Sequence, residues 1–109
     1  FAWIKTINKP ILGICAGMHI IGIAFNSKII KKEEIGPTII FHTRSHLLFQ
    51  EIKEVYSLHN FAIGTPKNFN IYLKSKKCTQ AIKHQTKDIY GVLFHPEVLN
   101  KEVITKFTQ

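Results

Sequence analysis

Cysteine is scarce in this chain: Cys15 and Cys78 are the only two among 109 residues. Two cysteines do not make the disulfide framework of a small secreted domain, and free thiols are typical of a reducing compartment. We therefore expect a cytoplasmic protein in which a thiol is available for chemistry. Because free cysteines are usually buried and inert, we expect Cys78 to be a small packing residue.

Long hydrophobic runs are also missing. The longest apolar stretches are interrupted by polar residues or by glycine, at Asn8, Lys9, Gly13 and His19. None is long enough to cross a bilayer and no signal-peptide pattern is present, so we expect no membrane partner. The chain begins with Phe1 instead of methionine, and we expect its natural start to lie upstream.

Acidic residues are few. Seven Asp and Glu stand against 15 Lys and Arg, which gives a formal net charge of +8. A basic surface can attract nucleic acid, but no aromatic residues interleave with the lysines and no nucleic-acid motif is present. We therefore expect no nucleic-acid partner. A solvated lysine-rich surface and a surface that docks onto an acidic protein both remain open.

What the chain does contain is an apolar run that ends in G-x-C-x-G, within residues 11–19. Gly13, Cys15 and Gly17 are followed by an amphipathic stretch, and this is the pattern of a nucleophile elbow: a strand, a strained turn and a helix. We expect glycine on both sides because a Cβ atom there would collide with neighbouring backbone. The Cys15 thiol would lie at a helix N-terminus, whose partial positive charge favours the thiolate.

A second motif, Phe94-His95-Pro96-Glu97, supplies the other groups that thiol catalysis needs. Residues 89–94 are predicted to form a short buried strand with His95 at its end. Glu97 lies two residues on, close enough to hold one ring nitrogen while the other faces Cys15. The three would make a nucleophile, a base and an orienting carboxylate. An inert thiol, and a helix-capping or solvated Glu97, are the alternatives.

Local patterns predict the remaining elements. Helices are expected at 1–7, 16–25 and 101–108, and Gly22 should let the second pack closely. Strands are expected at 11–14, 28–30, 38–43, 54–58, 70–74, 79–84 and 89–94, with a charged turn at 31–34 and a break at 35–37. This alternation of strands with helices indicates the α/β class.

Three segments resemble the class I (triad-type) glutamine amidotransferases: the elbow G-I-C-A-G-M at 13–18, Cys78–His84 and Ile89–Val98. They occur in the family's order and extend the resemblance from about Lys9 to the C-terminus. The most similar members are the amidotransferase subunits or domains of guanosine monophosphate (GMP) synthetases. The resemblance implies a three-layer, flavodoxin-like α/β fold, with a mostly parallel central sheet flanked by helices and the site at its C-terminal edge.

The resemblance also implies a reaction. Cys15 would attack the side-chain amide of glutamine, release ammonia and form a glutamyl thioester that water hydrolyses, with the backbone N–H of Ala16 in the oxyanion hole. Substrate-binding positions would be Gly13, Gly17, His19, Leu58, His59 and Asn60. No metal or organic cofactor is implied for this half. A partner synthetase, for GMP and hence purine nucleotide biosynthesis, would consume the ammonia and hold the ATP and Mg.

The chain also departs from the family's pattern. His19 stands where the family usually has glutamine, and only His59 is kept from a Ser-His-x-Asp stretch aligned with 58–61. The family's strands and glycine-rich loop before the elbow are not in the chain, so we expect residues 1–109 to be a single partial domain. That loop provides one oxyanion N–H, whose loss typically costs about 10²–10³-fold in rate, so we expect this chain alone to be weakly active or inactive.

Two other functions remain open. The altered His19 and Asn60-Phe61 would suit hydrolysis of another γ-glutamyl amide, and a degenerate domain could serve as a non-catalytic regulatory subunit. A reactive Cys15 would favour the hydrolase over the non-catalytic subunit. His42 and His46 have the i, i+4 spacing of helical metal ligands, but His42 falls in a predicted strand, so we interpret both as ordinary histidines and expect no metal site.

Overall fold

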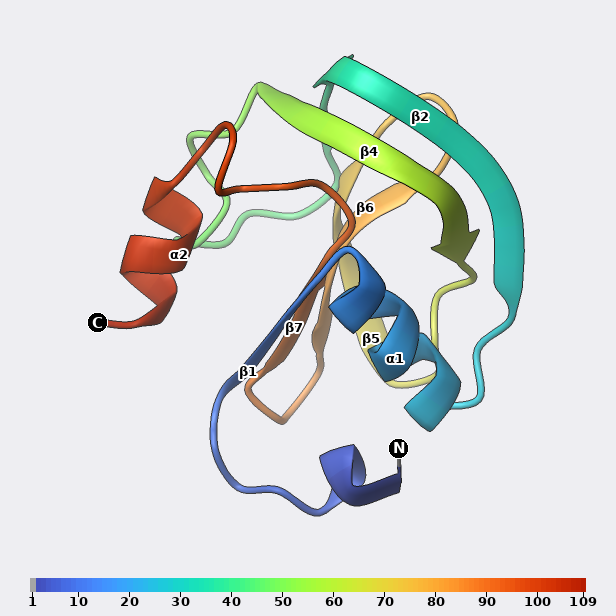
Figure 1. Cartoon of the computed structure of the whole chain (residues 1–109). Coiled ribbons are helices and arrows are strands. Elements are labelled where there is room, and N and C mark those ends of the chain that lie inside the picture. Colours follow the sequence, from blue (N-terminus) through green and yellow to red (C-terminus); the bar gives the residue numbers. More distant parts are fainter. Residues whose placement is uncertain (1) are drawn as a thin grey trace.

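Two β-sheets form the framework of the protein (Figure 1). The computed structural model describes residues 2–109. The larger sheet has the strand order β1 (Ile11–Ile14), β7 (Ile89–Val92), β6 (Thr79–His84), β5 (Phe69–Lys74) and β3 (Phe41–His42). The smaller sheet pairs β2 (Ile29–Ile39) with β4 (Glu54–Ile63). The helical segments in the described part are η1 (Ala2–Lys5), α1 (Ala16–Ala24) and α2 (Glu102–Phe107).

The larger sheet is mixed. Among the described strands, β1 and β7 pair in parallel and the other neighbours are antiparallel. Strands β6 and β7 follow each other through a short connection, which forces antiparallel pairing, whereas β1 reaches β7 across most of the chain. The α/β assignment holds, but in these residues the sheet is mixed where a mostly parallel one was expected.

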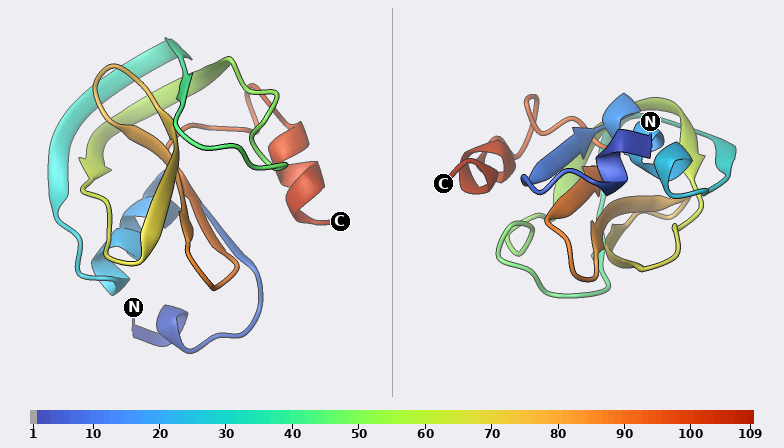
Figure 2. Two further views of the ribbon diagram at one scale, coloured as in Figure 1. Left: turned by 180° about the vertical axis from the view of Figure 1, so that it is seen from behind. Right: turned by 90° about the horizontal axis from the view of Figure 1, so that it is seen from below.

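Two hydrophobic clusters lie on opposite faces of this sheet. Met18 and Ile21 of α1 pack with Ile82 and Ile89 on one face. On the other face, neighbouring strand residues such as Ala81 and Val92 pack with Phe49, Phe94 and Val103 of α2. Since successive strand residues point to opposite faces, one strand feeds both clusters. Figures 1 and 2 show α1 and α2 on opposite sides of β1 and β7, so the sheet is covered on both faces.

Strand β2 is the main departure from the predicted elements. The charged turn expected at 31–34 and the break expected at 35–37 both lie inside it. Pairing with β4 runs from Ile29↔Ile63 to Ile39↔Glu54. The register shifts at a bulge between Lys31 and Glu34, and the charged run lies at this bulge. Because β2 has one neighbour, Pro37 can occupy its open edge without loss of a ladder hydrogen bond.

Strand β4 continues to Ile63, five residues past the end predicted at 58. The remaining predicted elements agree with the structure to within a few residues. The exceptions are the expected helix over 1–7, which is a short 3-10 turn at Ala2–Lys5 (Phe1 lies outside the described residues), and the expected strand at 38–43, which is divided between β2 and β3. In the part of the chain that the structure describes, no helix has the length and apolar character to span a membrane.

The two glycines of the elbow, Gly13 and Gly17, differ in whether the structure has room for a side chain. A Cβ atom on Gly13 would lie 2.6 Å from the Gly17 carbonyl oxygen and 2.7 Å from Ile21 Cδ1, so the expected collision is confirmed there. A Cβ atom on Gly17 would meet nothing within 4 Å, so the same expectation is wrong for Gly17. Close packing of α1 across β1 therefore depends on Gly13. Gly22 does allow the expected close approach, since its Cβ would lie 2.8 Å from Ile63 Cγ2.

Gly13→Ala should destabilise the fold by about 1–3 kcal/mol, because the added methyl must displace backbone. The matched variant Gly17→Ala should be neutral or stabilising by up to about 1 kcal/mol, since alanine favours the helix and has room. Urea unfolding followed by circular dichroism measures both. Equal free energies of unfolding for the two variants would contradict this account of the elbow.

Candidate active site

The parallel pair β1–β7 places the two sequence motifs at the same edge of the sheet. Its register runs from Ile11↔Ile89 to Ile14↔Val92, so both strands end together and Cys15 and His95 follow shortly after. Open α/β sheets carry their sites at this carboxyl edge. The two motifs lie near opposite ends of the sequence, and this ladder brings them together.

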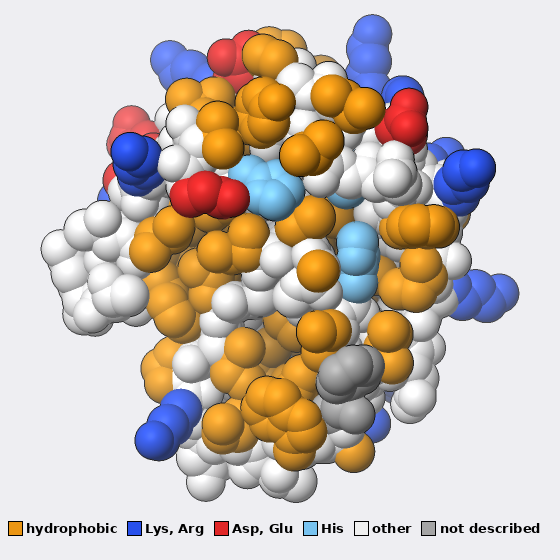
Figure 3. Space-filling view, viewed as in Figure 1, with side chains coloured by type: hydrophobic (Ala, Val, Ile, Leu, Met, Phe, Trp, Pro, Cys, Tyr) orange, Lys and Arg blue, Asp and Glu red, His pale blue; other side chains and the backbone are white. Residues whose placement is uncertain are grey.

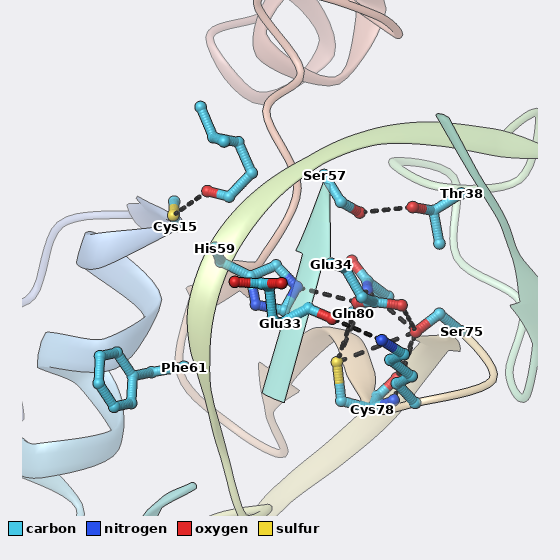
Figure 4. Close-up of polar contacts among 12 residues, drawn as sticks. Cys15, Glu33, Glu34, Thr38, Ser57, His59, Phe61, Ser75, Cys78 and Gln80 are labelled. Atoms are coloured by element: carbon cyan, nitrogen blue, oxygen red, sulfur yellow. Dashed lines mark hydrogen bonds and ion pairs between the residues drawn. The ribbon is translucent and has the colours of Figure 1, made fainter. Parts of the chain in front are cut away.

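Cys15 has a strained backbone at the junction of β1 and α1. Its φ and ψ angles are 51° and −101°, outside the regions that residues with side chains prefer, as in a nucleophile elbow. Its N–H donates to the Val92 carbonyl at 2.8 Å, so the β1–β7 ladder holds the residue in place. The thiol points toward strand β4 (Figure 4) and donates to the Leu58 carbonyl at 3.7 Å.

Glu97 orients His95. The Nδ1 atom of His95 lies 2.9 Å from Glu97 Oε2, and because a carboxylate only accepts, Nδ1 carries a proton. The Nε2 atom lies 3.4 Å from the Leu58 carbonyl, the same oxygen that the Cys15 thiol contacts. Once Nε2 has taken the proton of the thiol, its N–H can donate a hydrogen bond to that carbonyl. The predicted nucleophile, base and orienting carboxylate are thus brought together.

Strand β4 completes this arrangement with backbone groups. The His95 N–H donates to the Tyr56 carbonyl at 2.9 Å, and Leu58 presents its carbonyl two residues further along β4. Neither contact depends on the identity of the β4 side chains. The sequence therefore carried no signal for the Tyr56 and Leu58 carbonyls.

The expected thiolate at position 15 does not follow from the geometry. Burial raises the pKa of the Cys15 thiol above its ordinary value, the Ala16 backbone N–H lowers it, and the Glu97 charge raises it further, with a net increase. The favourable helix-terminus effect is present in Ala16 but is outweighed. A protonated resting thiol needs a base, and His95 is placed for that role.

The proposed substrate-binding positions other than His59 lie on β1, α1 and β4. His19 lies one helical turn after Cys15, and its Nε2 lies 2.8 Å from the Phe61 carbonyl, so it joins α1 to β4 beside the site. Gly17 lies on the same turn of α1, whereas Gly13 is buried in packing. Leu58 and Asn60 are exposed on β4, and Leu58 reaches the site through its carbonyl.

His59 is not brought to the site. Its side chain is fully buried and points to the inner face of β4, where Nε2 lies 2.8 Å from Glu34 Oε1. The ring therefore faces the buried cluster and not the outer side of β4, and its expected contact with substrate stays a prediction. The family-derived alignment identified the strand correctly but not the direction of this side chain.

A buried polar cluster around Glu34 was missed by sequence reasoning (Figure 4). The Oε1 atom of Glu34 accepts from His59, Gln80 Nε2 at 2.7 Å and Cys78 Sγ at 3.2 Å, and Oε2 accepts from Ser75 Oγ at 2.6 Å. The carboxylate joins β2 to β4 and to the β5–β6 hairpin. Its only sequence signal was one acid in a charged run, which resembled a surface turn.

This cluster also holds the second cysteine, Cys78, as a hydrogen-bond donor to Glu34. Burial, together with the hydrogen bond and the charge of Glu34, raises the pKa of Cys78 to about 12. Burial also acts to raise the pKa of Glu34, but hydrogen bonds from Ser75, Cys78 and His59 outweigh it and lower the pKa. Cys78 is therefore a structural donor, as expected of a packing residue.

The ligand atoms of Glu34, His59 and Cys78 lie within 4.8 Å of one another, close enough to share a metal ion. We interpret the group as a hydrogen-bond network because its short distances are those of donors around one carboxylate. His42 and His46 do not converge: His42 Nε2 contacts the Ile52 carbonyl, while His46 Nδ1 accepts from the Leu48 N–H at 3.0 Å.

The Cys15 site is partly open to solvent. The His95 side chain is 22% exposed and that of Glu97 56%. A cavity of about 460 Å³ lies elsewhere, against α2 and residues such as His46 and Tyr90. The groups that can react therefore lie at a surface that another part of the protein or a partner can cover.

Comparison with known proteins assigns the chain to a family. The model of the glutamine amidotransferase class-I family matches residues 1–108. The chain therefore belongs to the class I glutamine amidotransferases, and the relationship inferred from the two motifs is confirmed.

The similar proteins include several GMP synthases. In Methanococcus aeolicus, the relative is a separate subunit of a glutamine-hydrolyzing GMP synthase, and it is 39% identical over 85% of this chain and 53% of its own length. The glutamine-hydrolyzing GMP synthase of Borreliella burgdorferi is 39% identical over 91% of this chain and 21% of its own. The chain thus spans about half of the separate-subunit relatives and about a fifth of the longer ones.

Solved structures confirm the α/β fold. A crystal structure of a protein from Thermoplasma acidophilum, assigned to the same kind of GMP synthase subunit, superposes with a TM-score of 0.87 at 31% identity, over 96% of this chain and 58% of that one. A glutamine amidotransferase from Thermotoga maritima shares the fold at a TM-score of 0.76 and 20% identity, over 98% of this chain and 54% of that one.

Alkylation of Cys15 should keep accelerating as the pH rises above 9.0, because burial and Glu97 raise the pKa of this thiol. Glu97→Gln should move the profile to lower pH by removing one raising charge, whereas Glu51→Gln, far from the site, should not. Mass spectrometry of iodoacetamide adducts measures the rates and should find Cys78 unmodified. A Cys15 rate that levels off below about pH 8, near the value of an unperturbed thiol, would contradict the protonated resting thiol.

Glu34→Ala should destabilise the fold by about 3–5 kcal/mol, because it leaves buried donors without an acceptor. Glu33→Ala is the matched control, since Glu33 is exposed, and should change stability by less than about 0.5 kcal/mol. Denaturant unfolding at neutral pH compares the two.

The stabilisation that the Glu34 carboxylate gives to the fold should disappear in acid. The folded-state pKa of Glu34 lies below the ordinary value of 4.5, so the stabilisation is complete above that value and is lost as the pH falls through the lowered pKa. The difference in unfolding free energy between wild type and Glu34→Ala should therefore shrink below pH 4.5. A difference that is independent of pH would show that the charge is not what stabilises the cluster.

Proposed function

We propose that the polypeptide carrying this chain hydrolyses glutamine and supplies ammonia for GMP synthesis. The observation that carries the proposal is the convergence of Cys15 Sγ and His95 Nε2 on one carbonyl, with Glu97 on the opposite ring nitrogen. This arrangement supports Cys15 as the nucleophile, His95 as its base and Glu97 as the orienting group. Family membership supports glutamine as the substrate.

The reaction would proceed in two halves. His95 takes the proton of Cys15, and the sulfur attacks the carbonyl carbon of the glutamine side-chain amide. The Ala16 N–H, the first of α1 and without an acceptor in the helix, faces the developing oxyanion. His95 then returns the proton to the amide nitrogen, ammonia leaves, and a glutamyl thioester remains on Cys15.

Water completes the cycle. His95, again the base, takes a proton from a water molecule that attacks the thioester carbonyl, and glutamate and the Cys15 thiol are released. Glu97 holds the imidazolium that forms in each half. No metal or organic cofactor enters these steps in the proposal.

The ammonia would pass to an ATP-dependent synthetase that makes GMP. The support is the set of relatives named glutamine-hydrolyzing GMP synthase, in which this part occurs both as a separate subunit and within a longer chain. ATP and Mg are assigned to the synthetase, and the setting to the cytoplasm. The remaining half of the separate-subunit length is where we place the rest of the glutamine pocket and the second oxyanion donor.

A second candidate, hydrolysis of another γ-glutamyl amide, is favoured by one observation. His19 occupies the position four residues after the nucleophile, where the family usually has glutamine, and its ring contacts the Phe61 carbonyl at 2.8 Å. A side chain held in this way is less free to recognise the glutamine backbone groups. Comparison of rates on glutamine and on other γ-glutamyl amides separates the two candidates.

Labelling with a diazo-ketone analogue of glutamine tests the proposal directly. Modification should map to Cys15, be blocked by glutamine, and be lost in Cys15→Ser but kept in Cys78→Ser. His95→Ala should lower kcat for glutamine hydrolysis by about 10²–10⁴-fold, since general-base catalysis contributes that much. The chain and a version extended upstream should both be assayed, because the extended version should be the more active.

The outcomes are distinct. Labelling of the extended version alone would support the chemistry and locate a required part outside residues 1–109. Absence of labelling in both, with Cys15 still open to iodoacetamide, would overturn the glutaminase proposal. It would leave hydrolysis of another amide or a non-catalytic regulatory role.

A further inference from the structure

The peptide unit between Leu58 and His59 serves both sides of strand β4. Its carbonyl belongs to Leu58 and lies 3.7 Å from Cys15 Sγ and 3.4 Å from His95 Nε2. Its nitrogen belongs to His59, whose side chain is buried on the inner face, with Nε2 2.8 Å from Glu34 Oε1. Because a peptide unit is planar and rigid, a constraint on His59 limits the direction in which the Leu58 carbonyl can point.

The β2–β4 ladder is irregular at this position. Glu34 lies directly opposite His59, and the register shifts between Lys31 and Glu34. On the far side of this bulge the next pair is Lys31↔Phe61, so β2 carries one extra residue across it. A bulge disrupts the ladder hydrogen bonds locally, and bulges are common beside active sites, where they re-aim a side chain. Backbone pairing therefore holds β4 less firmly here than along its regular part.

A side-chain pair supplies the missing support at the bulge. Directly opposite side chains on one face of an antiparallel pair stabilise its register, and Glu34 and His59 do so through a hydrogen bond. The carboxylate is itself fixed, because Gln80 Nε2 donates to it at 2.7 Å and Ser75 Oγ at 2.6 Å. Since a carboxylate only accepts, His59 Nε2 carries a proton, while Nδ1 has no hydrogen-bond partner among the described residues. The bond to Glu34 is thus what orients the ring.

The two imidazole–carboxylate pairs of the protein differ in their surroundings. Figure 3 shows histidine side chains at the surface below the region of β2 and β4, and the His95–Glu97 pair is partly open to solvent. The His59 side chain is 0% exposed and that of Glu34 7%. Hydrogen bonds are stronger in a buried environment than in water. The inner pair is therefore the more rigid one, and the outer pair takes its position from the carbonyls of β4.

We infer that Glu34 and His59 are positioning residues for the reaction at Cys15. Their pairing aims the Leu58 carbonyl, which keeps the thiol and the His95 ring directed at one point. The inference rests on the proposed function. It differs from a contact between His59 and substrate, and also from a contribution to stability, which every donor in the cluster shares.

Three variants separate positioning from stability. His59→Leu removes the donor to Glu34, His59→Gln keeps an N–H donor near the place of Nε2, and Ser75→Ala removes another donor of the same carboxylate, on the β5–β6 hairpin. In glutamine hydrolysis by the polypeptide that carries residues 1–109, His59→Leu should lower kcat about 10–10²-fold, the cost of a small misplacement, with KM little changed. His59→Gln should recover most of this loss. Ser75→Ala should keep the wild-type kcat although its Tm falls.

Alkylation of Cys15 gives a second readout that needs no substrate. The thiol donates to the Leu58 carbonyl, and a hydrogen bond made by the neutral form disfavours ionisation. Loss of this bond in His59→Leu should raise the rate with iodoacetamide at neutral pH about twofold, the change in thiolate fraction that a weak hydrogen bond is worth. Ser75→Ala should react as wild type.

The remaining outcomes separate this inference from the proposed function. Equal losses of kcat in His59→Leu and Ser75→Ala, or no change of kcat and alkylation rate in His59→Leu, would overturn the positioning role and keep the glutaminase. A raised KM with unchanged kcat and alkylation rate would assign the His59 ring to substrate contact instead. Faster alkylation in His59→Leu, in a polypeptide that hydrolyses no glutamine, would support the positioning and refute the glutaminase. If His59→Leu does not fold, His59→Asn, whose amide is too short to reach Glu34, replaces it in each comparison.

Discussion

The parallel pairing of β1 with β7 is the constraint on which the rest of the site depends. It ends both strands at one level, and its last hydrogen bond, from the Cys15 N–H to Val92, holds a residue whose backbone is strained. Strain of this kind persists only where surrounding structure over-determines it. Gly13 supplies the second half of that support, because only glycine lets α1 return so closely over β1.

The β2–β4 ribbon is a second organising element, and its inner face and its edge have different roles. Inside, Glu34 gathers donors from β4 and the β5–β6 hairpin around one carboxylate. At the edge, the Tyr56 and Leu58 carbonyls meet His95 and Cys15. Because adjacent residues of β4 serve the buried cluster and the reacting groups, a change in the cluster would shift the carbonyl that both catalytic side chains contact.

The electrostatics of the site oppose a resting thiolate. Burial and the nearby Glu97 raise the pKa of Cys15 more than the Ala16 N–H lowers it. In the proposed reaction the same carboxylate has the opposite effect, since it orients His95 and would stabilise the imidazolium formed by proton transfer.

The sequence by itself predicted most of the local elements and the residues to which we assign the reaction. The G-x-C-x-G elbow and the His-Pro-Glu turn predicted β1, α1, β7 and the roles of Cys15, His95 and Glu97, because strained turns and short buried strands demand particular residues at fixed spacing. Only the tertiary structure decided the rest. Residues 31–37 became a continuous strand because β4 paired with them. His59 turned inward because Glu34 offered it an acceptor, and the Leu58 carbonyl entered the site although backbone atoms leave no mark in a sequence.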